Sequence, residues 1–364
     1  MAEQLIRETS TPTAPAHIES DDTLLKVQDL RMYFPIRRGL FSQVTGFVKA
    51  VDDVSFDIKM GETLGLVGES GCGKSTIGRC IVRAYQATGG QLLYRQPDNT
   101  VIDLASLEGD ALRELRKDIR LIFQDPYSSL NPRMTVFDNV SEALQVNNTL
   151  SRSQIHERVA YLLQRVGLRP EYMSRYPHAF SGGERQRIVI ARALITNPRL
   201  IVADEAVSGL DVSVRAQILN LLEELQAEFK LTYLFISHDL SVIRHICDRV
   251  AVMYVGKLVE SATIDELYRR PKHPYTEALL SSVPINDPRL RDRNVRDRLR
   301  GDVADPSNPP SGCYFHPRCT YAKEICSTKE PALLQVNTNE KQAHYSACHF
   351  ANELSLSGVI RDEN

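Results

Sequence analysis

The stretch GESGCGKST at residues 68–76 matches the pattern G-x-x-x-x-G-K-[ST] of loops that cradle phosphate groups. Its members are Gly68, Glu69, Ser70, Gly71, Cys72, Gly73, Lys74, Ser75 and Thr76. The glycines let successive backbone N–H groups converge on one anion, and a following helix adds its positive N-terminal end. In this pattern Lys74 reaches the β- and γ-phosphates, and the hydroxyl of Ser75 is a ligand of Mg²⁺.

The residues on either side of this loop support the match. Residues 62–67 form a short, largely apolar run, which is typical of a buried strand. Residues 75–83 contain no proline and can form a helix. Strand, glycine-rich loop and helix thus follow in the order that a nucleotide-binding loop requires. We prefer this interpretation to the alternative, a glycine-rich turn at the surface.

Composition limits the possible classes of protein. The chain has 364 residues, enough for one large domain or two ordinary ones. Its hydrophobic content of 42% and charged content of 25% are typical of a soluble globular protein. The net charge of −2 gives no reason to expect nucleic acid as a partner. No run approaches the roughly 20 apolar residues of a membrane-spanning helix.

The N-terminal residues 1–22 are rich in Thr, Pro, Ser and acidic residues, which predicts a disordered tail. They contain no apolar signal core, which argues against secretion. The chain has seven cysteines, and without a signal these indicate a reducing compartment. In such a compartment cysteines bind metal more often than they form disulfides.

Short apolar runs at residues 119–123, 200–203 and 231–236 predict the strands of a core sheet. Helical patterns separate them, including apolar spacings of three and four within residues 134–175. Strands that alternate with helices predict an α/β fold with a mainly parallel sheet that is covered on both faces. Ahead of this core, residues 24–58 predict an antiparallel β-rich part, with separate strands at 47–51 and 54–58.

Asp204 and Glu205 directly follow the apolar run at 200–203. A carboxylate at the end of such a strand lies beside the bound Mg²⁺ in P-loop nucleotidases. Glu205 is then placed to polarise the water that attacks the γ-phosphate. Two adjacent carboxylates would be poor core design without a cation, so a purely structural interpretation is weak.

Gln124 and His238 also end predicted strands. Gln124 is a candidate to contact Mg²⁺ or the attacking water, although glutamines at strand ends are commonplace. A lone histidine at such a position is more often structural. The carboxyl ends of parallel strands gather at one edge of a sheet, where ligands bind. We therefore expect both side chains near the phosphate that the two carboxylates serve.

A second anion-binding pattern precedes the apolar helix predicted at residues 188–194. It consists of Ser181, Gly182 and Gly183. A Ser-Gly-Gly turn that opens a helix is itself an anion nest with the added field of the helix dipole. One chain with two phosphate-binding helix ends suggests a nucleotide held between two copies or homologues.

The order of these motifs resembles that of the ATP-binding subunits of ABC transporters. The matching motifs are GESGCGKST, Gln124, FSGGERQR at 180–187, LIVADE at 200–205, SGLD at 208–211 and His238. The resemblance covers about residues 24–262. It implies a P-loop ABC ATPase domain that binds ATP and Mg²⁺, hydrolyses ATP and works as a dimer.

The resemblance also implies roles for single residues. These are Phe34 or Tyr33 for stacking on adenine, Gln124 for coupling to the membrane subunits, Ser181 to Gly183 for the opposite subunit's ATP, Asp211 for communication between subunits, Glu205 as the catalytic base and His238 as the γ-phosphate switch. The implied ligands of Mg²⁺ are Ser75, Gln124 and Asp204.

Three positions depart from the family pattern. Glu184 stands where glutamine is common, Ala206 where proline often follows the catalytic glutamate, and Gly209 where alanine is frequent. None of them removes a phosphate, metal or base group, so we expect hydrolysis to survive. Glu184 adds negative charge near the partner's nucleotide.

The last hundred residues resemble one branch of the family. HPYTEALLSSVP at 273–284 and NPPSGCYFHPRC at 308–319 look like the C-terminal extension of oligopeptide and dipeptide importer ATPases. That branch also includes nickel and opine importers, and the sequence leaves all these substrates open. The phrases MYFPIRRGLF at 32–41, VKAVDDVSF at 48–56 and FQDPYSSLNPRM at 123–134 resemble the F-type subunit.

This resemblance implies a set of partners and a location. An F-type subunit pairs with a homologous D-type ATPase, which leaves a homodimer as the alternative. Two integral membrane permeases and, indirectly, an extracytoplasmic substrate-binding protein complete the importer. No nucleic acid is implied. The implied place is the cytoplasmic face of the plasma membrane, as a peripheral subunit.

Four cysteines gather near the end of the chain, namely Cys313, Cys319, Cys326 and Cys348. Four thiolates can hold a zinc ion or a [4Fe–4S] cluster. Zinc sites usually bring close pairs of cysteines, which this spacing lacks, and the resemblance also favours a cluster. Nearby histidines (His316, His344 and His349) leave mixed ligation open, and buried structural cysteines are the plainer alternative. We predict a structural [4Fe–4S] cluster.

The predicted domains follow from these motifs. They are a tail at 1–22, an ABC-type ATP-binding domain at 23–265 with a helical subdomain at about 125–180, and a small Cys-rich C-terminal extension at 266–364. The predicted function is an ATPase subunit that drives an oligopeptide or dipeptide importer by dimer closure and hydrolysis. The alternative is a non-transport ABC ATPase of DNA repair or translation with a zinc module, for which we expect a second cassette, a coiled coil or a basic face.

Overall fold

The computed structural model describes residue 18 and residues 20–39, 42–147, 150–282, 301–337 and 343–359. Most of the predicted tail, residues 1–17 and 19, therefore lies outside the described residues. The chain forms two compact units. The first contains Met1–Ile58, Leu64–Ala105 and Ser237–Asn364 as far as they are described, and the second contains Lys59–Thr63 and Ser106–Ile236.

The first unit contains an antiparallel sheet of four strands in the order β2-β1-β4-β5. The strands are β1 (Thr23–Arg38), β2 (Gln43–Lys59), β4 (Gly89–Arg95) and β5 (Val101–Asp103). Strand β4 pairs antiparallel with both β1 and β5. This confirms the antiparallel β-rich part that the alternating pattern predicts.

The two strands predicted at 47–51 and 54–58 are one continuous strand, β2. The prediction of a break at the Asp52-Asp53 pair is wrong, although the backbone at Asp53 has a positive φ of 55°. Asp52 is buried and bonded within the unit, with an exposed fraction of 3%. Two adjacent aspartates often mark a turn. Here they remain inside the strand because the carboxylate of Asp52 accepts hydrogen bonds from Tyr33 and Tyr314.

The first unit also contains five further strands in the order β11-β12-β10-β9-β3, of which β3 leads into the glycine-rich loop. They are β3 (Thr63–Val67), β9 (Arg249–Tyr254), β10 (Lys257–Thr263), β11 (Leu334–Gln335) and β12 (Tyr345–Ser346). Strand β3 pairs parallel with β9, whereas β9, β10, β12 and β11 pair antiparallel in turn. The helices of this unit are α2 (Lys74–Ile81), α9 (Leu240–Ile246), α10 (Ile264–Arg269), α11 (Pro274–Ser281) and α12 (Glu324–Thr328), with short 3₁₀ turns η1 (Leu104–Ser106), at its edge, and η5 (His316–Arg318).

The second unit contains a parallel sheet in the order β8-β7-β6. The strands are β6 (Ile119–Ile122), β7 (Leu200–Asp204) and β8 (Thr232–Ile236). Every residue of β7 and β8 is buried, which agrees with the continuous apolar runs in the sequence. These pairings confirm the predicted parallel core.

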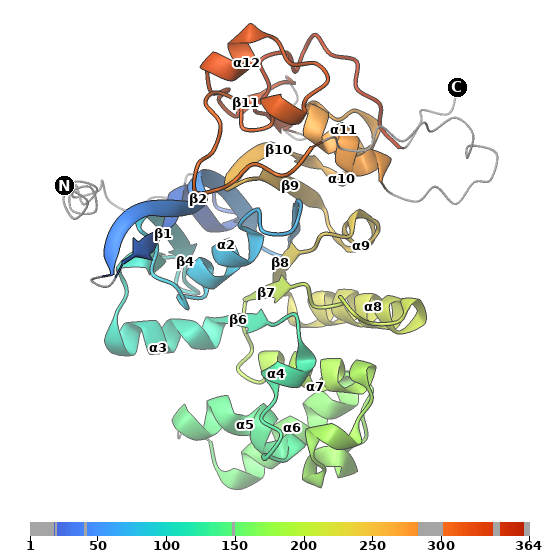
Figure 1. The fold of residues 1–364 in the computed structure, drawn as a ribbon. Coiled ribbons are helices and arrows are strands. Elements are labelled where there is room, and N and C mark those ends of the chain that lie inside the picture. Colours follow the sequence, from blue (N-terminus) through green and yellow to red (C-terminus); the bar gives the residue numbers. More distant parts are fainter. Residues whose placement is uncertain are drawn as a thin grey trace. The chain divides into compact units, whose positions relative to one another are not determined.

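Helices make up most of the second unit. They are α3 (Gly109–Asp118), α4 (Pro126–Ser129), α5 (Val136–Asn147), α6 (Arg152–Arg165), α7 (Gly182–Leu194) and α8 (Val212–Phe229), with 3₁₀ turns η2 (Pro170–Ser174) and η3 (Pro177–Ala179). Helices α5, α6 and α7 pack against one another (Figure 1). Capping boxes start α6 at Ser151 and α7 at Ser181. Because these caps satisfy free amides, both starts are fixed by the local sequence.

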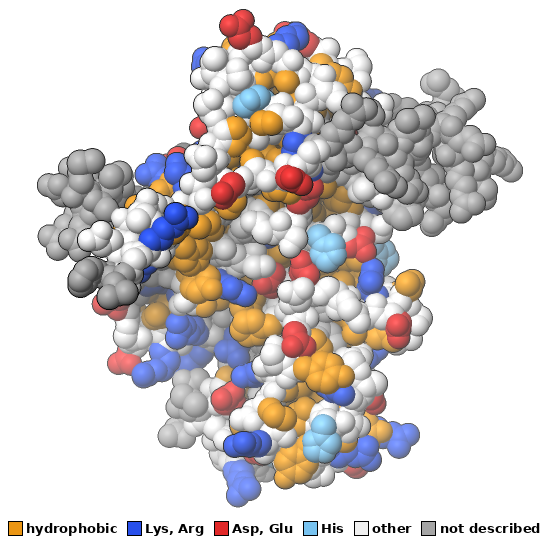
Figure 2. Space-filling view, in the orientation of Figure 1, with side chains coloured by type: hydrophobic (Ala, Val, Ile, Leu, Met, Phe, Trp, Pro, Cys, Tyr) orange, Lys and Arg blue, Asp and Glu red, His pale blue; other side chains and the backbone are white. Residues whose placement is uncertain are grey.

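Two surface properties bear on function. None of the helices in the described ranges is both long enough and apolar enough to span a membrane. The face drawn in Figure 2 carries acidic and basic side chains interspersed with one another. This mixture agrees with the near-neutral net charge of −2.

Candidate functional site

The loop between β3 and α2 has the geometry of an anion cradle. Strand β3 is fully buried, and the loop that follows it turns through three glycines with positive φ, at Gly68, Gly71 and Gly73. A Cβ atom on Gly68 would lie 2.2 Å from the carbonyl oxygen of Met253, and one on Gly73 would lie 2.0 Å from that of Ala50. Only glycine fits at these two positions, so the backbone passes where no side chain is tolerated.

Lys74 is the first residue of α2 and points back into this loop. Its Nζ atom donates hydrogen bonds to the carbonyl oxygens of Gly68, at 2.7 Å, and Glu69, at 2.9 Å. The side chain is almost fully buried. Helix α2 has no side chain capping its start and no acidic residue in its first turn. Its N-terminal field therefore stays available to an anion.

The aromatic candidates for adenine lie on β1. Phe34 is half-buried and meets Tyr85 edge to face, with ring centroids 5.6 Å apart. Tyr33 is also half-buried, and its hydroxyl donates to Asp52. Burial and this hydrogen bond raise the pKa of Tyr33. Both rings are held in place, and the choice between them stays a prediction.

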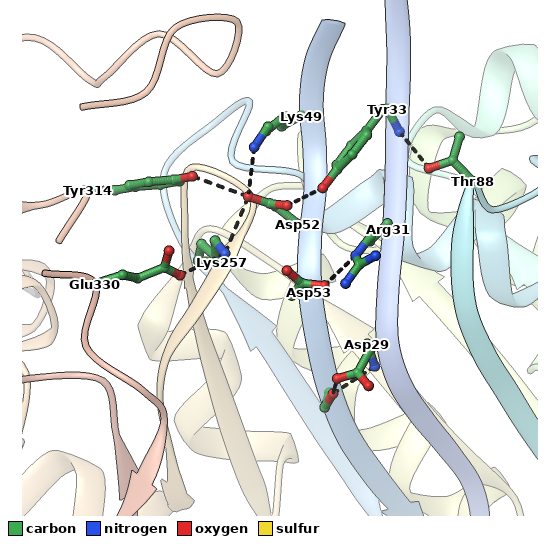
Figure 3. Close-up of polar contacts among 11 residues, drawn as sticks. Asp29, Arg31, Tyr33, Lys49, Asp52, Asp53, Thr88, Lys257, Tyr314 and Glu330 are labelled. Carbon is green, nitrogen blue, oxygen red and sulfur yellow. Dashed lines mark hydrogen bonds and ion pairs between the residues drawn. The ribbon is translucent and has the colours of Figure 1, made fainter. Parts of the chain in front are cut away.

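Asp52 is the centre of a polar network in the first unit (Figure 3). Besides Tyr33, its carboxylate contacts the hydroxyl of Tyr314 at 3.2 Å and the amines of Lys257 at 3.3 Å and Lys49 at 3.6 Å. Burial alone would raise the pKa of Asp52, but the hydrogen bond from Tyr33 and the nearby lysines outweigh it and lower the pKa.

His238 also belongs to the first unit. It lies between β8 and α9, directly before Asp239, whose side chain accepts a hydrogen bond from the backbone of Ser241 and so caps α9. The His238 side chain is exposed. Its predicted role at a γ-phosphate stays a prediction.

The carboxylates lie at the end of β7 in the second unit. Asp204 is the last residue of that buried strand, and its exposed fraction is 5%. Glu205 has a positive φ of 50°, and its backbone N–H donates to the carbonyl of Ile236. A non-glycine residue in this conformation is strained, and such strain concentrates at functional positions.

Gln124 follows β6 and reaches Glu205. Its Nε2 atom donates to the carboxylate oxygen of Glu205 at 2.7 Å. The structure thus brings together two of the residues that the sequence predicted to meet, although 81 positions separate them. This contact fixes the orientation of the Glu205 carboxylate at the end of β7.

The predicted signature turn opens α7. Ser181 is its N-cap, and the backbone N–H of Glu184 donates to the Ser181 hydroxyl at 3.3 Å. The Glu184 carboxylate in turn accepts from the backbone N–H of Ser181 at 2.9 Å and from its hydroxyl at 2.8 Å. These hydrogen bonds, the backbone one first, lower the pKa of Glu184. Further along, Asp211 is the exposed residue directly before α8.

The four C-terminal cysteines converge on one cavity in the first unit. This cavity is lined by Cys313, Cys319, Cys326 and Cys348, together with residues that include Phe315, His316 and His349. All of the cysteines are free thiols. Burial raises the pKa of Cys313 to about 12 and that of Cys319 to about 11. Within the described ranges, no three His, Cys, Asp or Glu side chains are arranged to hold a metal ion.

One contact of the phosphate loop has no signal in the sequence. Arg318 forms an ion pair with Glu69 across 249 positions of the chain, and the hydroxyl of Tyr275 accepts a hydrogen bond from the Glu69 backbone N–H at 2.9 Å. Glu69 occupies a position that the phosphate-loop pattern leaves unspecified. The motif therefore gives no reason to look for its partner.

Two sequence families match parts of the chain. The family described as ABC transporter matches residues 51–208, and the family described as oligopeptide/dipeptide transporter, C-terminal region, matches residues 259–326. The second match spans the end of the first unit's core and three of the four cysteines of the cavity.

Curated relatives match nearly the whole chain. The oligopeptide transport ATP-binding protein AppF of Bacillus subtilis is 53% identical over 91% of this chain and 98% of its own length. The oligopeptide transport ATP-binding protein OppF of Salmonella typhimurium is 49% identical over 87% of this chain and 95% of its own length.

Solved structures share the fold of the larger part of the chain. The protein cbiO1 of Clostridium perfringens, described as part of the ABC transporter complex cbiONQ, has a TM-score of 0.57 and 29% identity over 68% of this chain and 91% of its own. The ATP-binding cassette MJ0796, solved as a dimer bound to ADP and Pi, has a TM-score of 0.57 and 28% identity over 66% of this chain and 99% of its own.

Proposed function

The chain belongs to the ATP-binding subunits of oligopeptide and dipeptide ABC importers, and we propose that it drives import of short peptides by binding and hydrolysing ATP. The observation that carries this proposal is the loop after β3, where neither Gly68 nor Gly73 admits a Cβ atom. The substrate class follows from the names of the relatives. Their similarity favours an importer over a non-transport ATPase of DNA repair or translation.

The residues of the loop fit a bound triphosphate. Backbone N–H groups of Gly68–Thr76 and the amine of Lys74 bind the phosphates, and Lys74 exchanges its two carbonyl partners for phosphate oxygens. Mg²⁺, when bound, neutralises phosphate charge. Its proposed ligands are Ser75, Gln124 and Asp204. The ring of Tyr33 or Phe34 stacks on adenine.

Glu205 is the proposed catalytic base. It accepts the proton of the attacking water, and the amide of Gln124, 2.7 Å away, orients its carboxylate. His238 contacts the γ-phosphate. Phosphoryl transfer is catalysed mainly by positioning of the reactants and by stabilisation of charge. The positive φ of Glu205 supports a role for this residue in positioning the attacking water.

Partner subunits complete the proposed machine. Ser181 to Gly183 contact the ATP of a second, D-type ATPase subunit, and Asp211 takes part in communication between the two. Two integral membrane permeases convert closure of this dimer into movement of substrate, which an extracytoplasmic binding protein delivers. The chain acts as a peripheral subunit at the cytoplasmic face of the plasma membrane.

We also propose a structural [4Fe–4S] cluster at the cysteine cavity. Its four proposed ligands line one cavity, although they are not arranged around a single ion. A zinc ion needs all its thiolate sulfurs within about 2.3 Å of one point. In a [4Fe–4S] cluster each thiolate binds a different iron, so the four sulfurs lie farther apart. The cluster, when bound, supplies four Fe–S bonds that cross-link this part of the chain.

The cluster is tested by anaerobic purification of the full chain. We expect brown protein with about four irons and four sulfides per chain, because each cysteine binds one iron of the cluster. Replacing Cys326 by Ser should abolish the colour, and replacing the scattered Cys247 by Ser should keep it. Stoichiometric zinc without sulfide would contradict the proposal.

The importer function is tested by ATP turnover and by partners. In the assembled transporter, Glu205→Gln should keep ATP binding and slow hydrolysis by about 100-fold or more, because it removes the base. The exposed Glu224→Gln on α8 is the matched control and should leave turnover unchanged. Recovery of the chain with ribosomes or DNA, and without integral membrane proteins, would contradict the importer role.

A further inference from the structure

The segment at residues 313–319, here called the cysteine segment, has two sides. Cys313 and Cys319 at its ends line the cysteine cavity. Between them, Tyr314 and Arg318 reach residues near the phosphate loop instead. One short segment therefore contacts both the cavity and the nucleotide-binding part of the first unit.

Arg318 binds the phosphate loop through an ion pair with Glu69. Its two terminal nitrogens lie 2.7 Å and 3.1 Å from the two carboxylate oxygens, and one of them also donates to the hydroxyl of Tyr254 at 3.3 Å. The Arg318 side chain is 5% exposed and that of Glu69 is 23% exposed. A bidentate arginine–carboxylate pair is directional, and here the guanidinium is almost buried, so the pair fixes the orientation of Glu69.

The main chain of Glu69 is held as well. Its backbone N–H donates to the hydroxyl of Tyr275 at 2.9 Å. Tyr275 is fully buried and packs with Tyr254 and Phe315, whose ring centroids lie 4.7 Å and 5.4 Å away from its own. The residue after Gly68 is thus held at both its amide and its carboxylate by groups from the C-terminal third of the chain.

The other end of the cysteine segment is anchored separately. The Tyr314 hydroxyl donates to Asp52, and the neighbouring Lys257 bridges Asp52 to Glu330 at 3.3 Å and 2.7 Å (Figure 3). The hydrogen bond of Tyr314 to Asp52 therefore holds the cysteine segment four residues before Arg318. This second contact helps to position the Arg318 guanidinium against Glu69.

The negative charge of Glu69 explains why its ion pair with Arg318 affects the phosphate site. A carboxylate on a loop that binds phosphate repels its ligand unless a cation compensates it. We propose that Arg318 is a positioning residue of the phosphate loop, which pairs with Glu69 to hold the loop and to neutralise the carboxylate that the loop itself carries. This inference rests on the proposed ATP site.

Calorimetric titration of the full chain with Mg-ATP tests the inference. Arg318→Gln should weaken ATP binding about tenfold, because it leaves one uncompensated negative charge beside the phosphates. Adding Glu69→Gln to this variant should restore affinity to within about threefold of the wild type, because the repelling charge is then gone. Lys323→Gln removes an exposed cation from the same C-terminal part and should change affinity less than about twofold.

The rescue separates positioning from general damage. If Arg318 only stabilised the C-terminal fold, Glu69→Gln would not restore binding, and the proposal would be overturned. Should Arg318→Gln not fold, as judged by thermal unfolding, Glu69→Gln alone is decisive. It should bind ATP at least as tightly as the wild type, and a tenfold loss would refute the electrostatic role.

Failure of this inference differs from failure of the ATP site. A wild-type chain that does not bind Mg-ATP would overturn the proposed function. A wild-type chain that binds ATP, loses it with Lys74→Ala and keeps it unchanged with Arg318→Gln would overturn only the role of Arg318.

Discussion

The starts of α2 and α7 are two helix ends to which we assign phosphate, and they are built in opposite ways. Helix α2 begins after Gly73, with no side-chain cap and no acidic residue in its first turn. Helix α7 begins after Ser181 with a complete capping box, in which the carboxylate of Glu184 covers the backbone N–H and the hydroxyl of Ser181.

This difference shows how much of each site is formed before nucleotide arrives. Helix α2 has no side-chain cap, so an anion there displaces the contacts of Lys74 with Gly68, Glu69 and Cys72 rather than a carboxylate. At α7 the carboxylate of Glu184 already accepts from the backbone N–H and the hydroxyl of Ser181, which are two of the donors at this helix start. Phosphate therefore competes with Glu184 at α7, whereas it enters a preformed site at α2.

The largest expected effect breaks the cradle at α2. Gly73→Ala should weaken ATP binding at least about 100-fold, because its Cβ would overlap a carbonyl oxygen 2.0 Å away at a φ of 107°. Calorimetric titration measures the loss. Gly71→Ala is the matched control, since this glycine also has positive φ but nothing within 4 Å of its Cβ. It should cost about tenfold, and equal losses in both variants would contradict the steric argument.

A smaller effect is expected at the matching glycine of α7. A Cβ on Gly183 would lie 2.5 Å from a methyl carbon of Val214, which is a side chain that can turn aside. Gly183→Ala should therefore destabilise the chain by only about 1–3 kcal/mol, seen as a drop in the thermal midpoint of roughly 2–10 °C. Adding Val214→Ala should recover most of the midpoint. If the thermal midpoint did not recover, the overlap with Val214 would not be the cause of the destabilisation.

The smallest effect concerns the charge of Glu184. Its pKa is lowered in the folded chain, so its contribution to stability is present above its ordinary value of 4.5 and is lost as the pH falls through the lower folded value. The side chain is largely solvated, so the loss should stay below about 1 kcal/mol. Thermal unfolding between pH 6 and pH 3 measures it.

Glu184→Gln is the comparison for that measurement. It keeps the size of the side chain but carries no titrating carboxylate, so its thermal midpoint should fall less steeply over the same range of pH. Parallel curves for the wild type and the variant would assign the acid sensitivity to other groups.

Local chemistry made α2 predictable from the sequence. The glycine pattern, the apolar run of β3 and the lysine that follows all act within a few residues of one another, so their spacing was sufficient. The same holds for β7 with its terminal carboxylates and for the turn at Ser181. The prediction that Gln124 and Glu205 approach each other also depended only on the ends of parallel strands.

The failures have a common physical cause. The separate strands predicted within β2 are joined because Asp52 finds partners on β1 and in the C-terminal part, which no local pattern reveals. The pair of Arg318 and Glu69 joins two positions that are each unremarkable in their own surroundings. The spacing of the four cysteines predicted that they gather, and they do line one cavity, but the spacing says nothing of what lies between them.

The long reach of Arg318 has a consequence for how the protein is made. A ribosome synthesises Glu69 249 residues before Arg318, so the phosphate loop leaves the tunnel long before the group that holds it exists. Until then its carboxylate has no guanidinium partner. In the role proposed for Arg318, a truncated or unfinished subunit carries an uncompensated charge at the loop, and we expect it to bind ATP about tenfold more weakly than the complete chain.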